Sequence, residues 1–362
     1  MEEAGNDDMI FKNTGGSLPV PNVQSFASSK DCTEIPEKYI RPELNDSTLV
    51  LNAADGQGDI PVIDLSRLHH PQHSEDEMLK LSLACEHWGF FQLINHGVPN
   101  EVIEKMKIAM GEFFQLPLEA KKAYGQPPDS VEGYGQAFVV SEDQKLDWAD
   151  MYILSTNPVH GRNLKLWPTN PPTFKEALEQ YSLELRKVSH VLLDSIGKSL
   201  KIDEFICLFE DCLQSVRMNY YPPCPQASKV LGLSPHSDAG ALTILLQVSE
   251  VQGLQIKKNG VWLPVKPLPG AFIVNIGDII EIMSNGKYKS IEHRVMVNTE
   301  QERMSIATIH NPRFDAKVGP LPETLEKSEP YYKTISHHEY IRMLFSSKLE
   351  GKNLLDRMKL EA

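Results

Sequence analysis

Apolar residues recur with helical spacing in three segments of the first 200 residues. In residues 75–88, acidic residues open the segment and four apolar side chains follow at three or four positions apart: Met78, Leu81, Cys85 and Trp88. This spacing places apolar side chains on one face of a helix. Residues 99–116 and 173–200 carry the same pattern. We therefore expect three amphipathic helices, with short strands at 59–66 and 90–97.

The pattern changes from about residue 213, where short β-rich runs alternate with Gly, Pro, Asn and Asp. The runs are "SVRMNYY", "ALTILLQ", "GLQIKK", "VWLPVK", "AFIVNIG", "EIMSNG", "SIEHRVMVN" and "RMSIATIH". Asn259-Gly260, between two of these runs, is a strong hairpin signal. About eight closely spaced strands predict a sandwich or barrel such as the double-sheet jelly roll. Residues 334–362 return to a helical pattern.

These patterns divide the chain into four parts that share one β core. Residues 1–58 form a tail and an extended arm, of which 1–16 are expected to be disordered. Residues 59–210 form a mixed helical and strand region, 211–315 the β core and 316–362 a C-terminal helical segment. We expect a mainly β core with flanking α-helices, not two independent domains.

Composition narrows the classes of partner. The 362 residues carry a formal net charge of −13, which argues against nucleic acid or an anionic membrane as partner. The five cysteines contain no CxxC pair, as in a chain with free, packed thiols in a reducing compartment. The first residues lack a targeting pattern and no apolar run is long enough to span a membrane. We expect a cytoplasmic protein, with a monomer as the default oligomeric state.

A histidine and an aspartate interrupt the strand-like stretch "LSPHSDAGALTILLQ" at residues 233–247. His236 and Asp238 are two positions apart, so in a strand both would point to one face. A buried carboxylate needs compensation, and a metal ion supplies it. His293 lies 57 residues later in another strand-like run. Two histidines and one carboxylate form the ligand set of non-haem iron(II) oxygenases.

Two further pairs of polar residues share strand faces in the same core. Arg303 and Ser305 can bind a carboxylate, because a guanidinium donates two parallel hydrogen bonds and a hydroxyl adds a third. Asn219 and Tyr221, on an earlier strand, can donate to the same acid. Singly, these pairs are weak signals: an HxD pair is commonly a surface turn, and Arg303 could pair with exposed glutamates. The hypothesis depends on their combination and order.

The remaining histidines are interpreted differently. His96 could ligate a metal, but we favour a role in capping the loop after the strand at 90–97. The pairs His69-His70 and His337-His338 lie in polar surroundings and are expected to be solvated.

The sequence resembles the plant 2-oxoglutarate and Fe(II)-dependent dioxygenases over about residues 15–360. The matching stretches are "IPVIDLS", "WGFFQLINHGV", "EGYGQAF", "QKLDWADMY", "RMNYYPPCPQ", "LGLSPHSDAGALTILLQ", "GLQIKKNGVWLPVKPLPGAFIVNIGD" and "ERMSIATIHNP". Within that family the chain is most similar to the senescence-related group, with its alkaloid O-demethylases and norcoclaurine-synthase-like proteins. The resemblance implies a distorted double-stranded β-helix, a cupin-like jelly roll, in which 59–210 is the non-haem dioxygenase N-terminal region.

The resemblance also implies the cofactors and the reaction. Fe(II) would be bound by His236, Asp238 and His293, and 2-oxoglutarate by Arg303, Ser305, Tyr221 and Asn219. Dioxygen would be the oxidant, and ascorbate an in vitro reductant. A small aromatic plant metabolite of alkaloid, flavonoid, coumarin or indoleamine type would be hydroxylated or O-demethylated, with release of succinate and CO2. The candidates for an aromatic substrate pocket are Tyr124, Phe138, Tyr152 and Phe314.

Three alternatives stay open at the level of sequence. An iron oxidase that does not use 2-oxoglutarate could share the metal ligands. A norcoclaurine-synthase-like condensing enzyme is a second possibility, although no dedicated acid–base pair is evident. A non-enzymatic binding protein on the same scaffold is a third, but it would have no need of three costly metal ligands.

Overall fold

The structure is a computed structural model, and it describes residues 17–28, 34–44, 59–128, 130–326, 328–346 and 350–361. The expected disordered tail at 1–16 lies outside the described residues. The largest sheet of the described structure has eight strands in the order β1-β2-β10-β7-β12-β5-β4-β3. Their bounds are β1 Val62–Asp64, β2 Phe90–Ile94, β10 Phe272–Ile276, β7 Leu242–Gln247, β12 Arg303–Asn311, β5 Leu213–Tyr221, β4 Asp150–Asn157 and β3 Gly133–Gly135.

A four-stranded sheet completes the β core. Its order is β6-β11-β8-β9, with β6 Leu233–His236, β11 His293–Val295, β8 Leu254–Lys258 and β9 Val261–Pro264. Both sheets are antiparallel apart from the β1–β2 pair. This is the jelly roll that the strand pattern predicted. A two-stranded ribbon, β13 Lys317–Val318 with β14 Ile335–Ser336, lies in the C-terminal segment.

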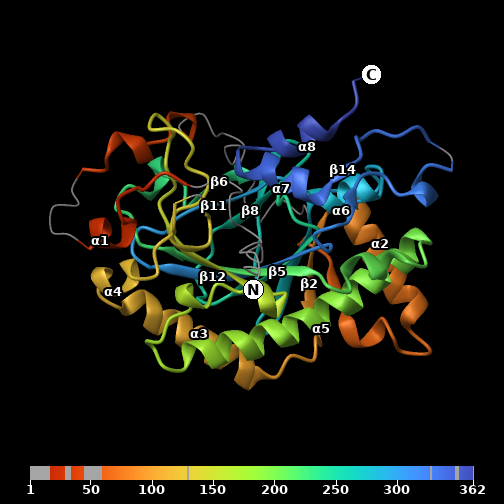
Figure 1. Cartoon of the computed structure of the whole chain (residues 1–362), viewed down its shortest axis with the longest axis horizontal. Helices are drawn as coiled ribbons and strands as arrows, with labels where there is room; N and C mark the ends of the chain where they lie inside the picture. Colours follow the sequence, from red (N-terminus) through yellow and green to blue (C-terminus); the bar gives the residue numbers. More distant parts are fainter. Residues whose placement is uncertain are drawn as a thin grey trace, which may run out of the picture.

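Helices cover the β core on two sides. The bounds of the α-helices are α1 Val23–Ala27, α2 Ser74–His87, α3 Asn100–Gln115, α4 Leu118–Lys122, α5 Phe174–Leu200, α6 Asp278–Met283, α7 His337–Phe345 and α8 Asn353–Met358. Figure 1 shows α3 and α5 along one side of the core and α7 and α8 along the opposite side. Single 3-10 turns connect the elements at 37–39, 42–44, 65–67, 159–161, 164–166, 205–209, 227–229 and 322–324.

The long helix α5 is stabilised because its apolar stripe packs against the eight-stranded sheet. Leu178, Tyr181, Leu185, Leu192 and Ile196 recur at three- to four-residue intervals or multiples of them and are fully buried. Each such side chain contributes about 1.5–3 kcal/mol when removed from water. The helix contacts β5, β7 and β12, so it fixes the outer face of the strands that carry the polar pairs on their inner face.

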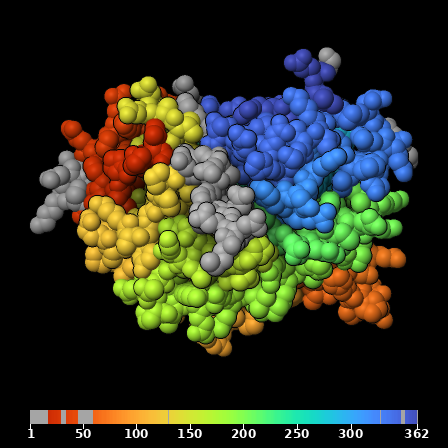
Figure 2. Space-filling model, in the orientation of Figure 1, coloured from red at the N-terminus to blue at the C-terminus, as the bar shows by residue number. Residues whose placement is uncertain are grey.

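The N-terminal arm, residues 17–28 and 34–44, is joined to the core by hydrogen bonds. Leu18 N donates to Val139 O, and Leu146 N donates to Lys38 O. The backbone N–H groups of Val23 and Gln24, at the start of α1, donate to the buried carboxylate of Asp150. Figure 2 shows the arm (red) lying against the segment that contains these partners (yellow). The arm is therefore part of the folded unit.

One predicted strand is a helix instead. The stretch "EIMSNG" falls at the end of α6 and the turn after it, where we expected a β-rich run. All six residues of α6 are buried. A strand on a half-exposed sheet would bury only alternate side chains, whereas a helix enclosed on all sides accommodates the continuous run Ile279-Ile280-Glu281-Ile282-Met283. Likewise, only His293–Val295 of "SIEHRVMVN" is extended.

No helix among the described residues is both long enough and apolar enough to cross a lipid bilayer.

Candidate metal centre and adjoining cavities

The three residues predicted to bind a metal lie together at one end of the four-stranded sheet. His236 is the last residue of β6, and His293, the first residue of β11, is its direct partner in the antiparallel ladder. The Nε2 atoms of His236 and His293 lie 3.5 and 3.6 Å from Asp238 Oδ1. Among the described residues this is the one cluster of three or more side chains with metal-ligand spacing.

Backbone carbonyls orient both imidazoles toward a common point. His236 Nδ1 lies 2.8 Å from Ser234 O, and His293 Nδ1 lies 3.1 Å from Ile291 O. A carbonyl oxygen only accepts, so each Nδ1 carries a hydrogen and each Nε2 is the ring nitrogen turned toward Asp238. Burial and the neighbouring His236 lower the pKa of His293 to about 4, so its ring is neutral near pH 7. Neutral imidazole is the form that ligates metals.

Asp238 offers one free oxygen to the same point. Its Oδ2 accepts hydrogen bonds from Thr243 Oγ1 at 2.6 Å and Asn275 Nδ2 at 2.8 Å, which leaves Oδ1 facing the two Nε2 atoms. Burial by itself raises the pKa of Asp238, but His293, His236 and the Asn275 hydrogen bond hold it well below its usual range. One carboxylate and two imidazoles are a donor set that fits Fe(II) and leaves coordination positions open.

The loop after β6, not the strand, positions Asp238. We expected His236 and Asp238 to share a strand face, but β6 ends at His236. The carbonyls of Asp238, Gly240 and Ala241 accept hydrogen bonds from the backbone N–H groups at 278, 279 and 277. The start of α6 thus replaces a neighbouring strand as the loop's hydrogen-bond partner.

Gly277 allows this close approach of two backbones. A Cβ atom at this position would lie 2.1 Å from Gly240 O and 2.9 Å from Asp238 O, which is impossible without movement of the loop. A glycine is required here for space, since its φ of −101° is open to any residue. Nothing in the local sequence indicates this contact.

A second group of polar side chains lies beside the metal centre, in a cavity between the two sheets. Arg303 pairs with Tyr221 and Ser305 pairs with Asn219 across the β12–β5 ladder. All four side chains line the same cavity as the three predicted metal ligands. The structure therefore brings together every residue that we predicted for the metal and the co-substrate.

Arg303 is a buried cation without a carboxylate partner among the described residues. It is 1% exposed, and its Nε and Nη2 atoms have no hydrogen-bond partner there. Nη1 donates to Ser305 Oγ at 3.4 Å, and the guanidinium lies 5.1 Å from the centre of the Tyr221 ring. Burying an unpaired charge is costly, so a dicarboxylic acid that reaches Arg303 from the metal would remove this cost. The residues present thus fit 2-oxoglutarate.

A second cavity opens on the other side of the metal centre and is lined mainly by apolar groups. Its walls include His236 and Asp238, side chains of β4 such as Met151 and Ile153, and one face of α7. Arg217 lines both cavities and donates from Nε to Asn219 Oδ1 at 2.8 Å. The two cavities therefore meet at the metal centre.

Of the four aromatic residues predicted for the substrate pocket, the structure brings one to this cavity. Phe138 lines it, has a left-handed φ of +65° and stacks on Phe345 of α7 at 6.0 Å between ring centres. Tyr152 is instead buried in the core, where it stacks on Phe113, because alternate residues of β4 face opposite sides of the sheet. Tyr124 packs against Phe113, and Phe314 is 38% exposed beside His338.

Our interpretation of His337 as solvated is wrong. Its side chain is buried, lines the cavity and bonds from Nδ1 to Arg313 O at 3.1 Å. The cavity face of α7 consists of residues 337, 340, 341, 344 and 345, which have helical spacing. That periodicity was present in the sequence and could have identified His337. His96, by contrast, bonds Val98 N and Gly270 O, as expected for a loop cap.

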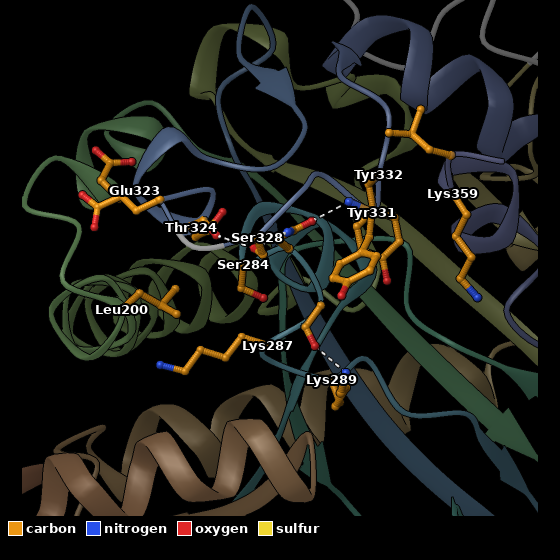
Figure 3. A pocket seen from close by; sticks show the side chains of 14 residues that line it. Leu200, Ser284, Lys287, Lys289, Glu323, Thr324, Ser328, Tyr331, Tyr332 and Lys359 are labelled. Atoms are coloured by element: carbon orange, nitrogen blue, oxygen red, sulfur yellow. Dashed lines mark hydrogen bonds between the residues drawn. The ribbon is translucent and has the colours of Figure 1, made fainter. Parts of the chain in front are cut away.

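A larger, open cleft of about 770 Å³ lies away from this centre, between the turn after α6 and the C-terminal segment (Figure 3). Its walls are held together by Asn285, which donates to Ser328 Oγ and Glu329 O. None of its lining residues lines either of the two cavities at the metal centre.

Comparison with known proteins gives matches along nearly the whole chain. The family model "2OG-Fe(II) oxygenase superfamily" matches residues 212–312, and "non-haem dioxygenase in morphine synthesis N-terminal" matches residues 60–170. S-norcoclaurine synthase 1 from Coptis japonica is 52% identical over 96% of this chain and 98% of its own length. Oxoglutarate-dependent flavonoid 7-O-demethylase 1 from Ocimum basilicum is 47% identical over 97% of this chain and 94% of its own.

Among solved structures, the crystal structure of JOX2 in complex with 2OG, Fe and JA superposes with a TM-score of 0.86. It is 38% identical and covers 96% of this chain and 100% of JOX2.

Proposed function

This chain belongs to the 2OG-Fe(II) oxygenase superfamily, and we propose that within it the protein hydroxylates or O-demethylates a small aromatic plant metabolite. It is a 2-oxoglutarate-dependent oxygenase whose cofactors are Fe(II) and 2-oxoglutarate. The observation that supports the reaction class is the buried Arg303, whose Nε and Nη2 have no partner among the described residues, in the cavity that also contains the His236–Asp238–His293 cluster.

We assign the metal to His236, Asp238 and His293. The hydrogen bonds from Nδ1 to backbone carbonyls fix both imidazole tautomers, and Thr243 and Asn275 occupy the second oxygen of Asp238. These contacts prearrange three ligand atoms before the metal arrives, which reduces the ordering cost of binding.

We assign 2-oxoglutarate to Arg303, Ser305, Tyr221 and Asn219. The guanidinium pairs with the carboxylate remote from the metal, and the Ser305 hydroxyl donates to the same group. Tyr221 packs on the guanidinium and restricts its movement. When bound, Fe(II) and 2-oxoglutarate supply the redox chemistry: dioxygen oxidises one substrate C–H bond while 2-oxoglutarate loses CO2 and becomes succinate.

The apolar cavity beside the metal is the proposed substrate site. The stacked pair Phe138 and Phe345 forms an aromatic wall that suits a flat, apolar molecule. Phe138 retains a left-handed backbone that is unfavourable for a bulky residue, as is frequent at ligand sites. If the oxidised carbon is an O-methyl group, one methyl ether, one O2 and one 2-oxoglutarate yield the free hydroxyl, formaldehyde, succinate and CO2. Relatives named as a flavonoid 7-O-demethylase and a norcoclaurine synthase support an aromatic substrate.

The test is succinate formation by the purified full chain with Fe(II), ascorbate and 2-oxoglutarate in air. Flavones, benzylisoquinolines, coumarins and indoleamines are offered in turn, and product mass distinguishes hydroxylation from demethylation. We expect one class to stimulate succinate formation, and Asp238→Ala to abolish it. Stimulation by no aromatic class, with slow unstimulated 2-oxoglutarate turnover intact, would contradict the proposed substrate class.

A condensing activity is the second candidate, favoured only by the name of the Coptis japonica relative. It would appear as norcoclaurine formation that needs no 2-oxoglutarate and survives Arg303→Lys.

A further inference from the structure

His337 is held in one orientation at the edge of the apolar cavity. It is the first residue of α7, and its backbone N–H donates to Ala316 O at 2.9 Å. Its ring nitrogen Nδ1 lies 3.1 Å from Arg313 O. The side chain is 1% exposed to solvent and lines the cavity. Both backbone and ring are therefore tied to the 313–316 turn, and the ring does not rotate freely.

The Arg313 contact also determines which nitrogen carries the hydrogen. Because a carbonyl oxygen only accepts, the hydrogen is on Nδ1 and Nε2 is an acceptor. Nε2 has no hydrogen-bond partner among the residues that the structure describes. Burial lowers the pKa of His337 to about 4, which agrees with a neutral ring.

The other polar side chains of this cavity offer different chemistry. Arg217 only donates. The Tyr340 and Ser237 hydroxyls donate their hydrogens to Ala239 O and Asp278 Oδ2, so their oxygens can still accept. Asn311 Oδ1 accepts from Ala241 N, which leaves its amide hydrogens to donate. The Ser215 hydroxyl both donates and accepts. Apart from the metal ligands, His337 is thus the one side chain among the described residues of the cavity wall that offers a ring nitrogen as acceptor.

We propose that His337 is a specificity-determining residue whose Nε2 accepts a hydrogen bond from a hydroxyl or N–H group of the substrate. The inference rests on the function proposed above and deepens it: the substrate is an aromatic molecule with a free donor, such as a phenol. A fully methylated analogue would leave Nε2 buried and unpaired, so it would bind less well.

The first test determines the tautomer of the His337 ring and needs no substrate. Two-bond 1H–15N correlations are recorded at pH 7 on the 15N-histidine-labelled full chain loaded with Zn(II), a diamagnetic substitute for iron. The His337 signals are those lost in His337→Phe. We expect hydrogen on Nδ1 and a bare Nε2. A hydrogen on Nε2, or a doubly protonated ring, would overturn the inference whatever the substrate is.

The second test measures the preference for a phenol over its methyl ether, with binding followed by tryptophan fluorescence quenching. The probes are two matched pairs: 4′-hydroxy-7-methoxyflavone with 4′,7-dimethoxyflavone, and 7-hydroxycoumarin with 7-methoxycoumarin. For a pair that binds, we expect the phenol to have a Kd about tenfold lower than the ether in the unmodified chain. His337→Phe, which keeps a planar ring, should bring the ratio to within about twofold of one.

His338→Phe is the matched control, because His338 is the next residue on the same helix and is exposed. It should keep the tenfold preference. Equal affinities in the unmodified chain, or a preference that survives His337→Phe, would overturn the inference. Failure of all four probes to bind, with the expected tautomer present and 2-oxoglutarate still bound, would count against the proposed aromatic substrate class and not against the acceptor at His337.

Discussion

At the scale of single residues, two buried charges of opposite sign characterise the site. Asp238 is an ionised carboxylate, and Arg303 is a cation that is only 1% exposed. Each is too costly to keep in an apolar interior without compensation. Asp238 has hydrogen bonds and two neighbouring histidines, whereas two nitrogens of Arg303 have no partner in the described part of the chain. The structure is therefore complementary to an anion at one end of a cavity and a cation at the other.

Replacement of Arg303 by lysine tests whether Arg303 binds the anionic co-substrate. We expect the KM for 2-oxoglutarate to rise about tenfold or more, because a lysine ammonium cannot donate the two parallel hydrogen bonds that a guanidinium donates to a carboxylate. Arg294→Lys is the matched control: Arg294 is also buried, but it bonds Gln255 and packs on Trp262 outside both cavities. KM values from succinate formation check the prediction. An unchanged KM in Arg303→Lys would remove this residue from 2-oxoglutarate binding.

Glu132 is a buried carboxyl that should make stability depend on pH. Burial raises its pKa to about 7 from 4.5, although Ser155 N donates to it. Between these two pH values the folded state holds a proton that the unfolded state has lost, so stability falls as pH rises through this window. Glu132→Gln keeps a side-chain oxygen that can accept from Ser155 N and removes the charge. We expect the variant to be about 1–3 kcal/mol more stable at pH 8 and equal to the unmodified chain at pH 4.5.

Urea unfolding at the two pH values checks this prediction for Glu132. A stability difference of the same size at both would mean that the charge is not the cause.

At the scale of elements, the loop from Ser237 to Ala241 determines the geometry of the metal centre. It is held by the start of α6 on one side and by the C-terminal segment on the other, where Ser237 N donates to Gly351 O and Gly351 N donates to Pro235 O. Neither partner is adjacent in sequence. The position of Asp238 is therefore a property of three elements together.

Replacement of Gly277 by alanine should displace this loop. Its Cβ would lie 2.1 Å from Gly240 O, so the backbone must move. We expect a loss of about 2 kcal/mol in stability and weaker binding of Mn(II), used as a redox-stable probe. Gly111→Ala is the control, since a Cβ there meets nothing within 4 Å and alanine favours the helix. Unchanged Mn(II) affinity in Gly277→Ala would show that the loop does not depend on this contact.

At the scale of the whole molecule, both ends of the chain close around the β core. The N-terminal arm packs against the segment around residues 139–146, and the C-terminal helices α7 and α8 lie on the side of the core opposite α5 (Figures 1 and 2). Lys352 in the C-terminal segment pairs with the buried Glu281 of α6 at 2.9 Å. Glu281 also accepts from Ser290 N and Tyr332 Oη. This cluster fastens the end of the chain beside the metal centre.

Replacement of Lys352 by methionine should therefore destabilise the fold more than its partial exposure suggests. It leaves the Glu281 carboxylate, 7% exposed, without its cation. We expect a loss of about 1–3 kcal/mol in urea unfolding at pH 7. Lys359→Met is the control, because its pair with Asp356 is exposed at both ends and should contribute less than about 1 kcal/mol. Equal effects of the two substitutions would show that the chain end is not fastened by Glu281.

The sequence by itself determined the class of fold and the chemistry of the centre. Helical spacing and alternating strands follow from local periodicity. Histidine, carboxylate and arginine side chains in strand-like runs are anomalies, and a metal and an anion together explain their combination.

The tertiary structure decided what depends on contacts between distant residues. It placed Asp238 in a loop held by α6, turned Tyr152 into the core, and set the face of α7 that carries His337 against the apolar cavity beside the metal centre. Which face of a strand or helix borders a cavity depends on how the elements pack, and local sequence does not encode that packing.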